Sequence, residues 1–161
     1  MKLSGRPRLT FRPLETRDLP AISLVHHRAC LIAYRFINWR YPLDEVERWY
    51  SGKFIEWTWT LAAFGADATM AGFIALVEGH IDQLYVDPSH QRCGIGSTLL
   101  DRALESSAGP VTLHVFEENG LARRFYEQHG FANEQRQSVH DRAAAELAWD
   151  RATAFFKKHL G

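Results

Sequence analysis

The chain of 161 residues carries 19 basic and 19 acidic side chains, and 46% of it is hydrophobic. This length suits one domain with a substantial core, and the balanced charge excludes a general electrostatic attraction to nucleic acid or to a membrane surface. Residues 1–13 lack the apolar core of a signal peptide, and no apolar run approaches a membrane span. We therefore predict a single cytoplasmic domain over residues 1–161, and its two cysteines are too few for a disulfide framework.

The first half of the chain predicts helices packed on an antiparallel sheet. Apolar residues alternate where strands are expected and recur at helical spacing elsewhere. Aromatic residues are frequent before residue 51, and the simplest interpretation is core packing, with the lining of an acceptor pocket as the alternative. In chain order we predict a strand at 9–14, a helix at 18–34, a helix from about 42 to 52, a hairpin of strands at 57–64 and 70–77, and a strand at 81–86.

The second half predicts alternating helices and strands. A helix follows residue 94, and Gly109 is suited to its C′ position, with Pro110 just beyond. Residues 111–116 predict a strand. Asn119 is a good N-cap for a further helix, which Gly130 is expected to end.

The segment Gln91-Arg92-Cys93-Gly94-Ile95-Gly96-Ser97 joins a predicted strand to a predicted helix. Free N–H groups and the positive end of the helix dipole converge at such a junction, and glycines let a phosphate come close. A dinucleotide-binding fingerprint would need a glycine where Leu99 stands, and a P-loop would need a lysine in the turn. We therefore predict a pyrophosphate site of another kind.

The wider pattern is more specific than this turn. It runs Leu84-Tyr85-Val86-Asp87-Pro88, then Gln91-x-x-Gly94-x-Gly96, then Asn119-x-x-Ala122-x-x-Phe125-Tyr126-x-x-x-Gly130-Phe131. Together these residues resemble the GNAT superfamily of acyl-CoA-dependent N-acetyltransferases. The resemblance implies an α/β fold (α+β by layer): a mixed, largely antiparallel sheet that is splayed at its centre after Val86, with helices on both faces.

The resemblance also implies acetyl-CoA as co-substrate, and no spacing of His or Cys indicates a metal. Backbone groups of Leu84 and Val86 would pair with the pantetheine arm like an added strand. Amides of the glycine turn would cradle the pyrophosphate, Asn119 would bind the pantetheine, and the helix after it would pack along the cofactor or belong to the core. The expected cofactor-binding residues are Leu84, Tyr85, Val86, Gln91, Arg92, Cys93, Gly94, Ile95, Gly96, Ser97, Asn119, Ala122 and Phe125.

Tyr126 stands where the family's general-acid tyrosine stands, and a packing tyrosine is the alternative. The general base is open between Glu78 and His80, with Asp82, His114 or water behind them. Relatives place a glutamate in this region, whereas histidine is the residue type that titrates nearest neutral pH. If the strand is regular from Glu78 onward, Glu78, His80 and Asp82 share a face with Leu84, although Gly79 argues for a turn there.

We expect transfer of an acetyl group to a primary amine of a small molecule or a peptide terminus by direct attack. A non-catalytic acyl-CoA sensor or assembly module is the alternative, and a nucleotide binder is disfavoured by the turn. The family usually closes with two strands, which requires residues 143–149 to be a strand against their helical propensity. Residues 155–158 are expected to form a short tail helix or a contact in a homodimer.

Overall fold

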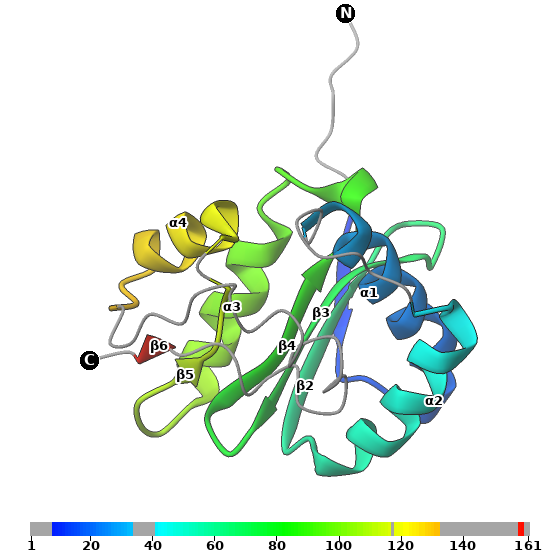
Figure 1. The fold of residues 1–161 in the computed structure, drawn as a ribbon, viewed down its shortest axis with the longest axis horizontal. Coiled ribbons are helices and arrows are strands. Elements are labelled where there is room, and N and C mark those ends of the chain that lie inside the picture. Colours follow the sequence, from blue (N-terminus) through cyan, green and yellow to red (C-terminus); the bar gives the residue numbers. More distant parts are fainter. Residues whose placement is uncertain (1–7, 34–40, 117, 133–157, 160–161) are drawn as a thin grey trace, which may run out of the picture.

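The computed structural model describes residues 8–33, 41–116, 118–132 and 158–159. The described strands form one sheet in the order β1-β2-β3-β4-β5-β6, antiparallel except between β4 and β5. In Figure 1, α1 and α2 cover one side of the sheet and α3 and α4 lie on the other. The predicted mixed sheet with helices on both faces is confirmed. The elements are β1 (Thr10–Arg12), α1 (Leu19–Ala33), α2 (Leu43–Lys53), β2 (Trp59–Phe64), β3 (Met70–Val77), β4 (His80–Val86), α3 (Ile95–Ser106), β5 (Thr112–Leu113), α4 (Gly120–Gln128) and β6 (Lys158–His159).

Two hydrophobic cores flank the sheet, one under each layer of helices. On β3, Phe73 belongs to the core under α1 and α2, whereas Ile74 belongs to the core under α3 and α4. Both side chains are fully buried. A strand that is covered on both faces is apolar at consecutive positions, which explains the unbroken apolar run of residues 70–77. The predicted hairpin is confirmed, because β2 and β3 pair antiparallel around Gly65.

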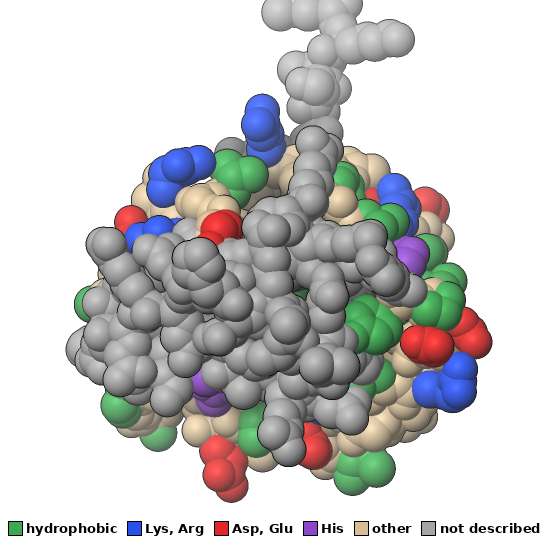
Figure 2. All heavy atoms as spheres, viewed as in Figure 1, with side chains coloured by type: hydrophobic (Ala, Val, Ile, Leu, Met, Phe, Trp, Pro, Cys, Tyr) green, Lys and Arg blue, Asp and Glu red, His purple; other side chains and the backbone are tan. Residues whose placement is uncertain are grey.

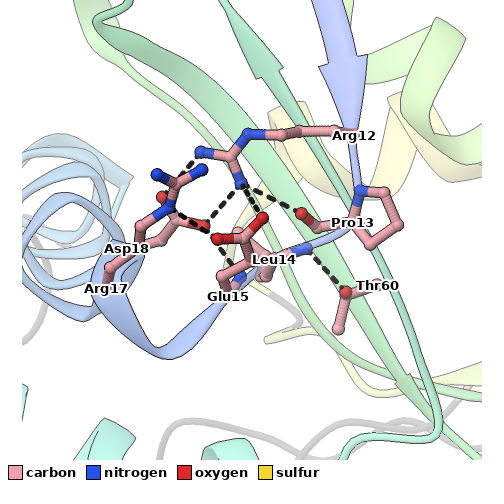
Figure 3. Close-up of polar contacts among 7 residues, drawn as sticks. All are labelled: Arg12, Pro13, Leu14, Glu15, Arg17, Asp18 and Thr60. Atoms are coloured by element: carbon pink, nitrogen blue, oxygen red, sulfur yellow. Dashed lines mark hydrogen bonds and ion pairs between the residues drawn. The ribbon is translucent and has the colours of Figure 1, made fainter.

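The entry into α1 is fixed by a partly buried ion pair (Figure 3). The Arg12 guanidinium donates to both carboxylate oxygens of Asp18, at 2.8 and 2.9 Å, and the Glu15 amide donates to the same carboxylate at 2.8 Å. Burial opposes the charge of Asp18, but these hydrogen bonds and the Arg12 charge hold its pKa below the ordinary value. In addition, the Leu14 amide donates to Thr60 on β2 at 2.9 Å, so this junction anchors α1 to the sheet.

The helices of the second half begin as predicted, and one of them ends early. Asn119 caps α4 by accepting from the Ala122 amide at 3.2 Å, and Gly130 follows α4 with φ +86°. By contrast, α3 ends at Ser106, and Ser107 already has an extended backbone. The prediction of Gly109 as the C′ residue was therefore wrong.

The C-terminal residues that the structure describes form a short edge strand. Lys158 pairs with Leu113 and His159 with Thr112, both antiparallel. Lys158 is therefore part of β6 and not of a tail helix. Residues 143–149 and 155–157, for which we predicted a strand and a tail, lie outside the described residues.

Charged side chains do not gather by sign on the face shown in Figure 2. Basic and acidic side chains of the described residues both lie around its rim, with hydrophobic side chains between them. This distribution is in keeping with equal numbers of acidic and basic residues in the chain.

Candidate active site

The sheet opens beside β4. The parallel pairing of β4 with β5 consists of His80 with Thr112 and Ile81 with Leu113. Within the described ranges, no strand pairs with residues 82–86 on the side away from β3. The predicted splay at the centre of the sheet is confirmed, but it begins after Ile81 and not after Val86. Because the strands separate there, the predicted strand at 111–116 is limited to Thr112 and Leu113 of β5.

A bulge in β4 sets which groups face this opening. Ala75 pairs with Gln83 and the next residue, Leu76, pairs with Ile81, so Asp82 is an extra residue on β4. An extra residue reverses the alternation of a strand. As a result, Ile81 and Leu84 both pack in the core under α3 and α4, although a regular strand would put them on opposite faces.

The backbone of β4 presents hydrogen-bonding groups to the opening. The Asp87 amide donates to the Ala71 carbonyl at 2.8 Å, so this pair is hydrogen-bonded across β3 and β4. In an antiparallel ladder the bonded pairs alternate, and the N–H and C=O groups of Leu84 and Val86 therefore point away from β3. The Gln91 side chain approaches the Val86 carbonyl at 3.4 Å from that side. An extended amide-bearing ligand can pair with this edge like a strand.

The glycine turn lies at the end of the same edge. The Thr98 amide donates to the Gly94 carbonyl at 3.0 Å, which leaves the amides of Ile95, Gly96 and Ser97 without an acceptor inside α3. Gly94 has φ +76° and Arg92 has φ +65°, both in the left-handed region. The turn therefore directs several N–H groups and the positive end of α3 to one place, as an anion site requires.

Gly96 is the point where the turn, β4 and α4 meet. A Cβ atom at this position would lie 3.5 Å from the Phe125 ring and 3.6 Å from Val86. The turn, β4 and α4, which the motif predicts to bind one cofactor, are thus adjacent in space. Ala122 and Phe125 pack against the core under α3 and α4, so they line α4 on the side that faces this junction.

Tyr126 is 8% exposed and packs against the rings of Phe125 and Phe131, with centroids 5.1 and 5.4 Å away. Burial raises the pKa of Tyr126 well above its ordinary value. The hydroxyl is therefore protonated at neutral pH.

The comparison with protein families agrees with this geometry. Residues 31–131 match the model of the acetyltransferase (GNAT) family. The chain belongs to the GNAT family.

Relatives with known names share this family. Peptidyl-lysine N-acetyltransferase YjaB of Escherichia coli is 40% identical over 70 residues, which cover 44% of this chain and 47% of YjaB. Spermidine N(1)-acetyltransferase of Vibrio cholerae is 32% identical over 139 residues, which cover 78% and 80%. The chain spans about half the length of YjaB and of some other curated relatives that it matches.

Solved GNAT structures have the same fold. The solution structure of E. coli YjaB has a TM-score of 0.65 at 25% identity and covers 78% of this chain and 83% of its own. The crystal structure of V. cholerae spermidine N-acetyltransferase with CoA and spermine has a TM-score of 0.60 at 28% identity, with coverage of 79% and 82%. PaiA of Thermoplasma acidophilum, solved with coenzyme A, has a TM-score of 0.67 at 20% identity and covers 95% and 98%, which shows the fold.

The structure separates Glu78, His80 and Asp82, three of the candidates for the general base. Glu78 lies exposed in the turn before β4, with φ +48°. Asp82 accepts a hydrogen bond from Trp57 Nε1 at 2.8 Å and lies 3.2 Å from Nζ of Lys53, the last residue of α2. A shared face with Leu84 required a regular strand from Glu78 onward, and this condition is not met, because residues 78 and 79 form the turn that Gly79 indicated and the bulge at Asp82 breaks the alternation. His80 remains on β4, with its Nδ1 2.7 Å from the Thr112 hydroxyl.

Some predicted cofactor residues point elsewhere with their side chains. The Tyr85 ring lies on the α1 side, 4.6 Å from the His26 ring, and the Ile95 side chain is buried in the opposite core. Only their backbones adjoin the opening and the turn. The side chains of Gln91, Arg92 and Cys93 are exposed.

Sequence reasoning missed the pair of Arg28 and Asp87. Arg28 Nη1 on α1 lies 3.1 Å from Asp87 Oδ2, and the other carboxylate oxygen accepts from the Ser89 amide at 3.0 Å. An Asp-Pro-Ser sequence predicts such a local cap, but nothing in the sequence indicates the partner on α1.

Among the described residues, no group of three His, Cys, Asp or Glu side chains is arranged to hold a metal ion. No described helix has the length and apolar character that crossing a membrane requires.

Proposed function

We propose that this GNAT chain transfers an acetyl group from acetyl-CoA to a primary amine of a small molecule or a peptide by direct attack. The open edge of β4 carries the proposal, because the backbone groups of Leu84 and Val86 that point away from β3 lead directly to the anion site at α3. Pantetheine amides and a pyrophosphate match these two features in that order. The names of YjaB and of the V. cholerae relative specify peptidyl-lysine and spermidine, both of which bear amines.

The residues of the turn fit coenzyme A by their backbone. The positive φ of Gly94 and the absence of a side chain at Gly96 let an anion approach the first amides of α3. Gln91 and Arg92 are exposed beside these amides, and Arg92 supplies a positive charge. Asn119 uses its side-chain oxygen in the cap, so its amide nitrogen is the group that would donate to the pantetheine.

Acetyl-CoA, when bound, supplies a thioester carbonyl for attack by the amine. The Val86 N–H faces the opening and would stabilise negative charge that develops on that oxygen. Tyr126 would assist departure of the sulfur as a hydrogen-bond and proton donor, and little assistance is needed because the leaving thiolate is a weak base, with an ordinary thiol pKa of about 8.5.

We place His80 ahead of Glu78 as the base that accepts the proton of the amine. The His80 ring lies 4.8 Å from the ring of His114, which follows the last paired residue of β5 and so stands at the start of the opening. Glu78 lies in the turn on the far side of the paired residues. A water molecule between the amine and His80 would pass the proton from one to the other.

Purified protein incubated with acetyl-CoA and a panel of amines tests the proposal, with free thiol as the signal. We expect thiol release that depends on spermidine, a lysine peptide or another amine in the panel, and none without an amine. Binding of coenzyme A without turnover would indicate the sensor alternative. Absence of binding at millimolar coenzyme A would refute both.

The cytoplasmic location and a homodimer stay predictions.

A further inference from the structure

Asp87 joins three parts of the molecule at the start of the turn. Its amide bonds to Ala71 on β3, and its carboxylate caps the short helix at residues 88–90 through the Ser89 amide. The same carboxylate pairs with Arg28 on α1 at 3.1 Å. Only 5% of the Asp87 side chain is exposed, so Arg28, the Ser89 amide and hydroxyl, and His90 Nδ1 at 3.9 Å take the place of water around the carboxylate.

Arg28 belongs to the helix layer on the opposite side of the sheet from α3. Helix α1 also packs against the helix at residues 88–90, which leads into the turn. The pair of Arg28 and Asp87 is therefore a polar link between α1 and the segment that ends in the anion site. The turn itself needs support, because Arg92 adopts a left-handed conformation that non-glycine residues rarely take.

We propose that Arg28 is a positioning residue for the pyrophosphate turn. By pairing with Asp87, it holds residues 88–94 in the conformation in which the first amides of α3 converge. The role in ligand binding rests on the proposed function, whereas the ordering of the turn does not. Without Arg28, the buried Asp87 carboxylate loses its permanently charged partner, and the segment moves to bring the carboxylate to water.

Three variants separate this role from a general effect of removing an arginine. Arg28→Met keeps the length of the side chain and removes the charge, and Arg28→Lys restores the charge without the planar fork. Arg48→Met is the matched control, because Arg48 pairs with Asp44 at 3.2 Å on α2 and both side chains are 74% exposed.

Hydrogen exchange of the ligand-free protein tests the ordering directly. We expect Arg28→Met to speed exchange in residues 88–97 and to leave exchange in the β2–β3 hairpin unchanged. The exchange rate of Arg28→Lys in residues 88–97 should lie between those of Arg28→Met and the wild type. Unchanged exchange in the turn, or an equal rise in the hairpin, would overturn the positioning role.

Donor binding provides the second measurement. We expect Arg28→Met to raise the Kd of coenzyme A about tenfold, with no change in the Kd of acetyl-pantetheine, which lacks the pyrophosphate. Equal weakening of both ligands, or equal weakening by Arg48→Met, would contradict the proposal. If the wild type does not bind coenzyme A while the turn still loosens in Arg28→Met, the proposed function fails and the ordering role stands.

Discussion

His26 on α1 is buried against α2 and β4 and belongs to a directed chain of hydrogen bonds. The Tyr50 hydroxyl donates to Gln83 Oε1 at 3.0 Å, so its oxygen accepts from Nδ1–H of His26. Burial, with a smaller effect of the neighbouring His27, lowers the pKa of His26 to about 3. The imidazole is therefore neutral in the folded protein and serves as a structural donor.

This buried histidine makes stability depend on pH. Below about pH 6.5 the unfolded chain gains a proton at His26 that the folded chain does not bind, so the free energy of unfolding falls as the pH drops toward 3. We expect a contribution of up to about 1.4 kcal/mol per pH unit. Denaturant unfolding between pH 7 and 4 should show a shallower pH slope for His26→Asn than for the wild type. Equal slopes would contradict the assignment.

Tyr126 allows a test of the acid in the proposed reaction. Tyr126→Phe removes the hydroxyl and keeps the ring that packs on Phe125 and Phe131. We expect kcat to fall by about 100-fold, because general acid catalysis typically contributes this much, with little change in the KM for acetyl-CoA. Steady-state kinetics with a thermal melt measures both, and a full kcat in a folded variant would show that Tyr126 only packs.

The start of α3 combines two glycines with different physical requirements. Gly94 needs its positive φ and has open space around its Cβ position, whereas Gly96 is helical and has ordinary contacts there. Gly94→Ala should lower the free energy of unfolding by about 1–2 kcal/mol. Gly96→Ala should change it by less than about 1 kcal/mol, in the stabilising direction. Denaturant titrations of the two variants provide the comparison, and an equal loss in both would contradict it.

At the level of the whole molecule, a ligand that binds only the folded state must stabilise it. Coenzyme A at about 100 times its Kd should add about 2.7 kcal/mol to the free energy of unfolding. Thermal melts with coenzyme A, ATP and NAD test this, and we expect only coenzyme A to raise the Tm. A shift with ATP or NAD of the same size would favour a nucleotide site instead.

The parts of the fold that were predictable depend on local signals. The hairpin around Gly65, the cap at Asn119 and the glycine turn each need only a few neighbouring residues to be recognised. The bulge at Asp82 depends on the register between two strands, and the link from Arg28 to Asp87 joins residues far apart in the chain. Such features arise from tertiary packing, so the opening of the sheet was misplaced and Arg28 was missed.

The open edge of β4 also bears on the solubility of the ligand-free protein. A row of unpaired backbone groups is a template on which another chain can add a strand, and this is a common start of aggregation. Here the backbone groups of Leu84 and Val86 point away from β3 and form such an edge, with Gln91 Nε2 3.4 Å from the Val86 carbonyl. A bound pantetheine arm would occupy the same positions, so coenzyme A would protect the protein from self-association as well as take part in its chemistry.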